Sequence, residues 1–149
     1  VLFRSRIVTE TRDLFAQHNL RCTRQRIAVY EALCECRCHP TAEELFRLVR
    51  PRTDKLSLAT VYNALEALCS AELVQRMPTT NGSCRYDADT SEHLHVRFPS
   101  SAEIEDVPRD LGSKLIQRLP QDVLEEIEAE MGIKIDWVSV QLLASRRPG

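Results

Sequence analysis

The stretch from residue 57 to residue 87 constrains the fold most, because a helical pattern runs directly into a hairpin pattern. Its first part, SLATVYNALEALCSA, repeats apolar residues at the spacing of one helical face, at Leu58, Val61, Leu65 and Leu68. ELVQRM and SCRYD then read as strands, and the TTNG between them contains a strong hairpin-turn signal, Asn81-Gly82. Helices followed by a two-stranded hairpin predict a winged helix.

Further helical patterns precede this stretch. The first covers residues from about 6 to 18 and contains Ile7, Val8, Leu14 and Phe15. Thr23 is placed to cap the second, whose inner face is expected to hold Ile27, Val29 or Tyr30, Leu33 and Cys34. Thr41 and Glu44 form a T-x-x-E capping box that opens the third, which Pro51 ends and which points three apolar residues inward, Leu45, Leu48 and Val49.

The other face of the helix that Ser57 opens carries small, hydroxyl, aromatic and amide groups. Such a face fits the major groove, since small residues permit close approach and Asn63 can pair bidentately with adenine. On its own the same face would more often belong to an ordinary surface helix. With a hairpin beside it, arginines on the strands would contact phosphate. The candidate DNA contacts are Arg24, Ser57, Ala59, Thr60, Tyr62, Asn63, Arg76 and Arg85.

Charge and composition change along the chain. Residues 1–78 carry 12 Lys and Arg against 9 Asp and Glu, whereas residues 79–149 carry 8 against 13. The basic first half is a mild indication of a polyanionic partner, although scattered surface arginines would give the same balance. We expect an α+β protein with a winged-helix domain at 1–87, a polar hinge at 88–92, and a small α/β domain at 93–149.

The second half reads as strands and one helix. HLHVRF and AEIEDV are expected strands, PQDVLEEIEAEMG is an expected helix with Pro120 at its start and Gly132 past its end, and residues 133–143 alternate like a strand. Fewer than about 60 residues form a small core, so dimerisation is the natural way to stabilise this half. A homodimer would also present two reading helices to a palindromic operator. The expected core residues are Val96, Phe98, Ile104, Trp137, Val138 and Val140.

The segment CECRCHPTAEE brings Cys34, Cys36, Cys38 and His39 close together. No apolar run is long enough to cross a membrane and no signal peptide is visible, so we expect a cytoplasmic protein with reduced cysteines. Cys34 is expected to face the helical core, with the other two thiols in a turn, where thiol redox sensing is an open hypothesis. A separate thiolate metal site would need a fourth ligand, and the remaining cysteines lie on different elements, at Cys22, Cys69 and Cys84.

Four segments in this order resemble the ferric uptake regulator family of bacterial metal-dependent repressors. They are TRQRIAVYEAL, HPTAEEL, SLATVYNALEALCSAELVQR and RYDADTSEHLH, and the similarity runs from about residue 14 to residue 143. The resemblance implies a transcriptional repressor, not an enzyme. It also implies a winged helix, a dimerisation domain and a metal bound between them.

A set of metal ligands follows from the pattern and from this resemblance. His93 and His95 are two residues apart on an expected strand, so both would project from one face. Each histidine alone would more often be a surface residue, but the resemblance carries the ligand role to His39, Asp87, His93, His95 and Asp106. Imidazoles mixed with carboxylates suit Fe(II) or Mn(II), although Zn(II), Co(II) or Ni(II) can occupy such a site in vitro.

The carboxylates and cysteines narrow the branch of the family. Aspartate at both carboxylate positions is similar to the peroxide-sensing, PerR-like branch, in which a ligand histidine is oxidised, and His39 and His93 are the candidates here. Typical members carry C-x-x-C pairs after the H-x-H strand, but FPSS stands there and no cysteine follows Cys84. No structural Zn(Cys)4 site is therefore expected.

Other functions remain open at the level of sequence. A haem- or iron-responsive regulator of the same family is one, although this chain has no Cys-Pro dipeptide of the haem-regulatory type. A small non-haem iron enzyme is another, because histidines and carboxylates on strands can also build an oxygen-activating site. A metal-independent winged-helix regulator is the third. The sequence does not reveal the operator or the physiological signal.

Overall fold

The computed structural model describes residues 2–36 and 38–148, with side chains from Thr9 onward. The chain forms two compact units that divide between Ser91 and Glu92. This division falls inside the segment 88–92, for which a hinge is expected, and the hinge itself stays a prediction. The α+β fold class is confirmed, because helices and sheets occur in both units.

The first unit, which we call unit 1, begins with a cluster of helices. These are α1 (Leu2–Gln17), α2 (Arg24–Glu35), α3 (Ala42–Val49), the short 3-10 helix η1 (Arg50–Arg52) and α4 (Leu58–Ser70). All of the predicted caps form, since the hydroxyls of Thr23, Thr41 and Ser57 accept backbone N–H groups at the starts of α2, α3 and α4. The Thr41–Glu44 capping box is complete. Local side-chain chemistry therefore sets where each helix begins.

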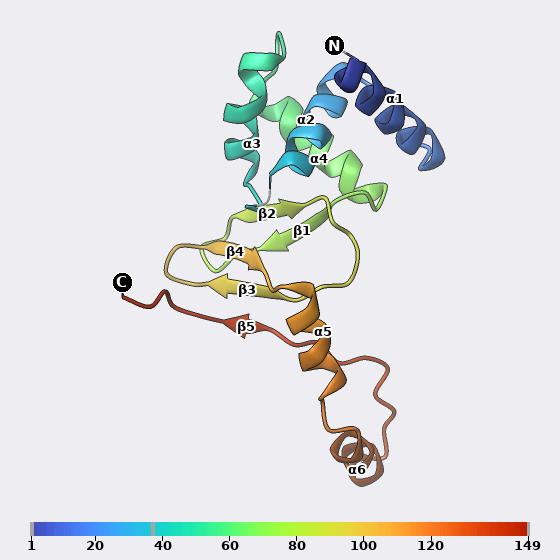
Figure 1. Cartoon of the computed structure of the whole chain (residues 1–149), viewed down its shortest axis with the longest axis vertical. Helices are drawn as coiled ribbons and strands as arrows, with labels where there is room; N and C mark the ends of the chain where they lie inside the picture. Colours follow the sequence, from blue (N-terminus) through green and yellow to red (C-terminus); the bar gives the residue numbers. More distant parts are fainter. Residues whose placement is uncertain (1, 37, 149) are drawn as a thin grey trace. The chain divides into compact units, whose positions relative to one another are not determined.

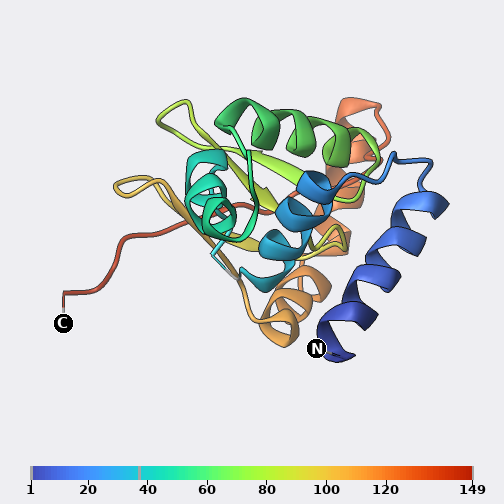
Figure 2. The same cartoon turned by 90° about the horizontal axis from the view of Figure 1, so that it is seen from above.

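A two-stranded hairpin follows the helices and completes a winged helix. Strands β1 (Gln75–Pro78) and β2 (Cys84–Asp87) pair antiparallel, so Gln75 lies opposite Asp87. The turn closes at Gly82, whose φ of 81° is the left-handed conformation that glycine adopts most easily. Figure 1 shows α2, α3 and α4 on one side of this hairpin, and Figure 2 shows α1 running alongside α2.

Unit 1 has a continuous apolar core. The predicted stripe of α4 is buried at Val61, Leu65 and Leu68, while Leu58 is half-buried. Phe15 of α1 packs edge-on against Tyr30 of α2, with ring centroids 5.5 Å apart. The expected inward residues Ile7 and Val8 lie outside the described side chains.

Two expectations about the core of unit 1 are wrong. Leu48 is 46% exposed, because the buried face of α3 is formed by Ala42, Leu45 and Val49. Cys34 is also exposed, since Leu33 and Val29 take the buried face of α2.

The second unit, unit 2, is built on a three-stranded sheet in the order β4-β3-β5. Strands β3 (His95–Phe98) and β4 (Glu103–Asp106) form the predicted antiparallel pair, while β5 (Leu142–Leu143) runs parallel to β3. The long strand expected at 133–143 is wrong, because only its last two residues pair with the sheet. His93 also precedes β3 and does not lie on it.

Two helices lie between β4 and β5. The predicted helix is confirmed as α6 (Gln121–Met131), with Pro120 as its N-cap and a left-handed Gly132 after its last turn. A second helix, α5 (Arg109–Gln117), was missed from the sequence because the glycine within it, Gly112, weakens the helical pattern.

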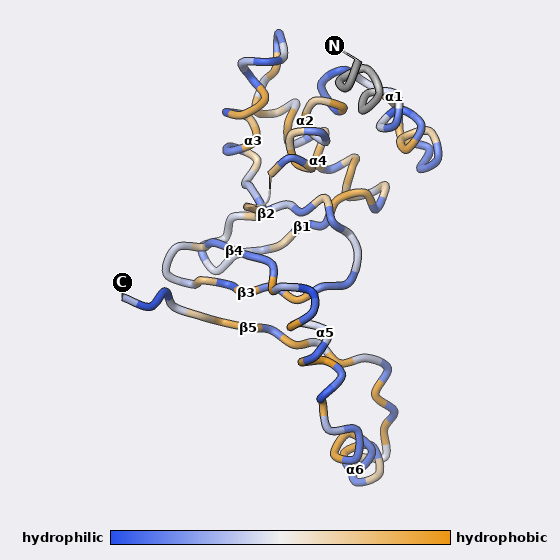
Figure 3. Tube along the Cα trace, viewed as in Figure 1, coloured by the Kyte–Doolittle hydropathy of each residue, from blue (hydrophilic) through white to orange (hydrophobic). Residues whose placement is uncertain are grey.

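Few apolar side chains of unit 2 are buried. Phe98 and Ile104 are buried as expected, but Trp137 is 78% exposed and Val138 is 42% exposed. The expectation that these last two fill the core of this unit is therefore wrong for the single chain. Figure 3 shows hydrophobic residues recurring along α6 and the extended segment after it. Such residues need a further surface to cover them.

Candidate metal centre

The first group of predicted ligands lies in unit 1, where the chain turns from α2 toward α3. His39 Nε2 lies 3.3 Å from Asp87 Oδ2, and His39 and Asp87 are only 3% and 7% exposed. A histidine and a carboxylate buried side by side are an arrangement suited to a cation. The structure thus joins two of the predicted ligands, although 48 positions separate them in the sequence.

Backbone interactions hold this pair in place. His39 has a φ of 45°, a left-handed conformation that histidine adopts more readily than most residues, and it reverses the chain between α2 and Thr41. The His39 carbonyl accepts a 2.9 Å bond from Arg85 Nη1, and Pro40 accepts one of 3.0 Å from Tyr86 N–H. Asp87 Oδ1 accepts from the N–H of Asp89, which leaves Oδ2 toward the imidazole.

The second group of predicted ligands lies in unit 2, around the carboxylate of Asp106. Its Oδ1 lies 2.9 Å from His93 Nε2 and 3.4 Å from His95 Nε2. The sheet register explains part of this geometry, because His95 and Asp106 are direct partners across β3 and β4. The rings of His93 and His95 are 4.3 Å apart and tilted by 55°. Two imidazoles and one carboxylate lie close enough together here to serve as ligands of a single ion.

The expected DNA-reading face of α4 is largely open to solvent. Ala59, Tyr62 and Asn63 are exposed, whereas Thr60 is half-buried. Tyr62 donates a 2.7 Å hydrogen bond to Glu43 Oε1, and this bond raises the pKa of Tyr62 to about 12. The same bond lowers the pKa of the Glu43 carboxyl. Ser57 is occupied in capping, since its Oγ accepts from Thr60 N–H at 3.1 Å.

The two hairpin arginines differ from each other. Arg76 is exposed and forms a 2.5 Å ion pair with Glu66 on α4, so it borders the candidate face. Arg85 is buried, where Nη1 donates to the His39 carbonyl and, at 3.1 Å, to Glu44 Oε2. Arg85 therefore contacts the His39 turn, and the phosphate contact expected from it stays a prediction. The capping-box pattern predicted the role of Glu44 at the start of α3. It could not predict the contact of Glu44 with Arg85, which lies 41 positions away.

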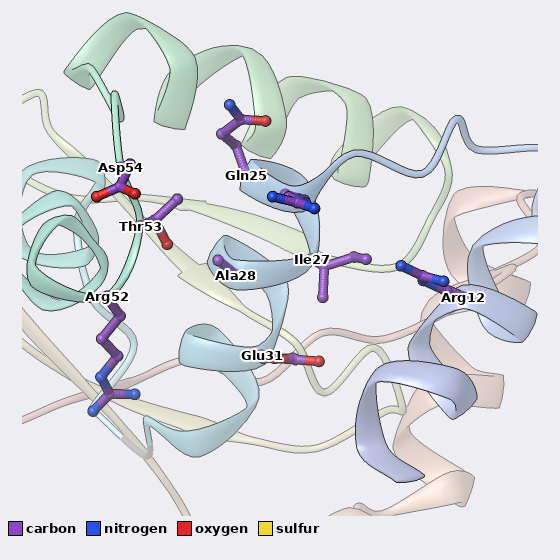
Figure 4. A pocket seen from close by; sticks show the side chains of 9 residues that line it. Arg12, Gln25, Ile27, Ala28, Glu31, Arg52, Thr53 and Asp54 are labelled. Atoms are coloured by element: carbon purple, nitrogen blue, oxygen red, sulfur yellow. The ribbon is translucent and has the colours of Figure 1, made fainter. Parts of the chain in front are cut away.

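Arg24, the remaining candidate DNA contact, lines a cavity of about 500 Å³ in unit 1. The cavity lies between α1, α2 and the loop before α4, and Figure 4 shows Arg12 on its α1 side. Arg52, also in the lining, is paired with Glu35 at 3.2 Å. Basic and acidic groups alternate around the opening, so the cavity has no strong preference for anions.

The cysteines form no cluster of metal ligands in the described part of the chain. Cys36 and Cys38 are joined by a disulfide, while Cys22, Cys34, Cys69 and Cys84 are free. The expectation that all six are reduced is therefore not met in this structure. None of the described cysteines belongs to a group of potential ligands with the histidines and acids. No helix among the described residues has the length and apolarity to cross a membrane.

Comparison with known proteins agrees with these features. The ferric uptake regulator family matches residues 17–141. A peroxide-responsive repressor, PerR, of Staphylococcus saprophyticus is 33% identical over 89 residues, which cover 60% of this chain and 60% of that protein. The peroxide operon regulator of Bacillus subtilis is 31% identical over 97 residues, or 65% of this chain and 67% of that one. The match thus spans three fifths to two thirds of these relatives.

Solved structures give the same fold over nearly the whole chain. The peroxide stress regulator of Campylobacter jejuni aligns with a TM-score of 0.60 at 25% identity and covers 94% of this chain and 96% of that one. The ferric uptake regulator of Vibrio cholerae aligns with a TM-score of 0.67 at 24% identity over 91% of this chain and 99% of that one, which shows the fold alone. Because the family match extends over most of the sequence, the chain belongs to the ferric uptake regulator family.

Proposed function

We propose that this protein is a metal-dependent transcriptional repressor that binds a palindromic operator as a homodimer in the cytoplasm. One divalent ion would be held by His39, Asp87, His93, His95 and Asp106. The observation that carries the proposal is that each unit brings imidazole and carboxylate side chains together. Membership of the ferric uptake regulator family supports the regulatory role, since a similar protein is a peroxide-responsive repressor.

The donor set is consistent with Fe(II) or Mn(II) as the regulatory ion. Nitrogen and oxygen donors mixed in this way suit those metals, and Zn(II) is a possible occupant in vitro. Solved relatives include a ferric uptake regulator of Pseudomonas aeruginosa with manganese and one of Francisella tularensis with iron. When bound, the ion supplies the positive charge that stabilises two carboxylates close together.

The ligand groups give this ion a means of controlling DNA binding. His39 and Asp87 belong to the unit that carries α4, while the other three ligands belong to unit 2. An ion that contacts both groups binds best to one mutual orientation of the units, so occupancy shifts the population toward that orientation. A hundredfold preference for it corresponds to about 2.7 kcal/mol. The protein would bind its operator in that orientation.

The surfaces required for DNA and for a second copy are both present. The exposed face of α4, with Ala59, Tyr62 and Asn63, supports major-groove reading, and Arg76 lies beside it for a phosphate. Unit 2 exposes the apolar side chains that a homodimer would cover, including Met131, Ile133 and Trp137. Arg24, on the wall of the cavity, is retained as a candidate phosphate contact.

Hydrogen peroxide is the signal that we propose. Aspartate at both carboxylate positions is similar to the peroxide-sensing branch, and curated relatives include peroxide-responsive repressors. When bound, Fe(II) would supply the electron that begins the reduction of peroxide, and overall one peroxide oxygen would add to an imidazole while the other leaves as water. The imidazoles of His39 and His93 would take up oxygen, lose their affinity for the ion and so release the operator.

Anaerobic titration of operator binding with Mn(II) or Fe(II) tests the proposal. His39→Ala and Asp106→Asn should each weaken metal-dependent DNA binding by about tenfold or more, the order seen when a supporting group of a metal site is removed. His18→Ala is the matched control, because His18 is exposed and its Nδ1 bonds Ala71 O, away from both ligand groups. Circular dichroism of each variant checks the fold.

Three results would contradict the proposal. Equal DNA binding with chelator and with metal would indicate a metal-independent regulator. Steady turnover of a small molecule with Fe(II) would indicate an enzyme. Peroxide treatment of the Fe(II) form that adds no oxygen to the peptides containing His39 or His93, measured by mass spectrometry, would exclude peroxide sensing through these residues.

A further inference from the structure

The disulfide of Cys36 and Cys38 lies directly before the candidate ligand His39. These cysteines flank a single residue, and their Cα atoms are 5.5 Å apart. Cys36 is the C-cap of α2 and its N–H donates to Leu33 O at 3.2 Å. Cys38 is exposed, whereas Cys36 is half-buried. The proposed function uses neither sulfur.

The chain on the other side of this disulfide is fixed to β2. Arg85 Nη1 holds the His39 carbonyl at 2.9 Å, the N–H of Tyr86 holds Pro40 O at 3.0 Å, and Thr41 forms a β-bridge with Arg85. The start of the segment is fixed by α2 and its end by β2. The connection between them begins at Cys36 and ends at His39, whose imidazole lies beside Asp87, and the disulfide joins Cys36 to Cys38 directly before that histidine.

We propose that Cys36 and Cys38 form a redox-active dithiol–disulfide pair that sets the affinity of His39 for the regulatory ion. This inference rests on the proposed function, because it assigns a second input to the same site. The disulfide form is the one in which His39 and Asp87 lie together here. The dithiol form leaves the connection more conformational freedom, which must be lost when the ion binds.

The redox step is balanced with hydrogen peroxide as oxidant. The sulfur of Cys38, which is exposed, attacks one peroxide oxygen and becomes a sulfenic acid, while the other oxygen leaves as water. The sulfur of Cys36 then attacks the sulfenic sulfur, the S–S bond forms and a second water leaves. Two electrons pass from the thiols to the peroxide. A small dithiol returns them by thiol–disulfide exchange and becomes a disulfide itself.

The test uses the full chain, free of metal during oxidation and reduction so that no histidine is oxidised. Peroxide treatment should leave four alkylatable cysteines of the six, and a phosphine reductant, removed before metal is added, should restore all six. Mn(II) is then titrated into each form and the free ion is followed by electron paramagnetic resonance. The dithiol form should bind Mn(II) about fivefold more weakly, the order expected when one further residue must be ordered.

Serine variants separate this pair from the other thiols. The double variant Cys36→Ser with Cys38→Ser should bind Mn(II) like the reduced wild type and should not respond to peroxide. Cys34→Ser is the matched control, because Cys34 lies two residues away and is exposed but free. It should keep both forms and the fivefold difference. Circular dichroism checks that both variants are folded.

The outcomes distinguish this inference from the proposed function. Equal Mn(II) affinity in the two wild-type forms overturns the inference and leaves the metal-dependent repressor intact. Failure of peroxide to link Cys36 to Cys38, seen in the mass of the peptide that contains both, overturns it as well. If neither form binds Mn(II), the proposed function fails and this inference fails with it.

Discussion

The two units bury their apolar residues very differently. Unit 1 has a core that extends from Phe15 to Tyr86 and includes residues of every helix and of the hairpin, except η1. In unit 2 the only large apolar side chains of the described chain that reach burial are Phe98 and Ile104, while Trp137 and Leu143 are 78% and 63% exposed. One unit is complete as a single chain, and the other is not.

The exposed apolar surface of unit 2 points to a need for association that unit 1 does not have. A core as small as that of unit 2 gives little stability to fewer than about 60 residues, so the exposed apolar surface is best explained by a second copy of the chain. Unit 1 needs no such partner, which leaves the face of α4 free for DNA. Changes in the two units should therefore affect different measurements.

The largest effect is expected from a core truncation in unit 1. Leu65→Ala removes a fully buried side chain of α4 and should lower the free energy of unfolding by about 3 kcal/mol. Urea denaturation followed by far-ultraviolet circular dichroism measures this, with Leu48→Ala, 46% exposed, as the control with a small effect. Trp137, the one tryptophan, reports on unit 2 by fluorescence. Equal loss of both signals would show that the units do not unfold independently.

The next effect is expected in unit 2 and on association. Trp137→Ser should weaken the proposed homodimer by about 2 kcal/mol or more, because large aromatic residues dominate the energy of interfaces. Sedimentation equilibrium measures the dimer constant, and the circular dichroism of unit 1 should hardly change. Asp136→Ala changes the neighbouring residue and is the control. An unchanged dimer constant for Trp137→Ser would place the interface elsewhere.

A third effect concerns the turn that holds His39. Arg85→Gln removes a buried guanidinium that bonds the His39 carbonyl and Glu44, and it should cost about 1.5 kcal/mol of the stability of unit 1. Mn(II) affinity should fall as well. Arg76→Gln breaks an exposed pair with Glu66 and should cost less than about 1 kcal/mol, with no change in Mn(II) affinity. Similar losses in the two variants would deny Arg85 its positioning role.

Sequence patterns predicted unit 1 better than unit 2 for a physical reason. Local caps at Thr23, Thr41 and Ser57 set the starts of α2, α3 and α4. The apolar stripe of α4 has the period of a helix packed on one side. The segment 133–143 alternates like a strand, yet most of it pairs with nothing in the described chain. The apolar residues that produce this alternation are not buried by the rest of the described chain.

The candidate site shows the same division between local and distant information. The H-x-H spacing and the carboxylate at the end of the next strand indicated the candidate ligands of unit 2. The pairing of β3 with β4 then places His95 opposite Asp106. The role of Arg85 was not visible, because it depends on β2 lying against the turn at His39. The charge of an arginine predicts a surface contact unless the tertiary partner is known.

The smallest effect is expected from the hydrogen bond between Tyr62 and Glu43 on the exposed face of α4. The hydrogen bond to Glu43 raises the pKa of Tyr62 from 10.0 to about 12, so its contribution to stability is complete below pH 10 and disappears as the pH rises through 12. Both groups are exposed, and the contribution should stay below about 0.5 kcal/mol. The difference in absorbance between wild type and Tyr62→Phe should titrate above pH 10, and Glu43→Gln should move that titration back toward 10. A wild-type midpoint equal to that of Glu43→Gln would mean that the bond does not persist in solution. At the proposed DNA contact, Tyr62 would then offer a free hydroxyl instead of one that is already bonded to Glu43 of α3.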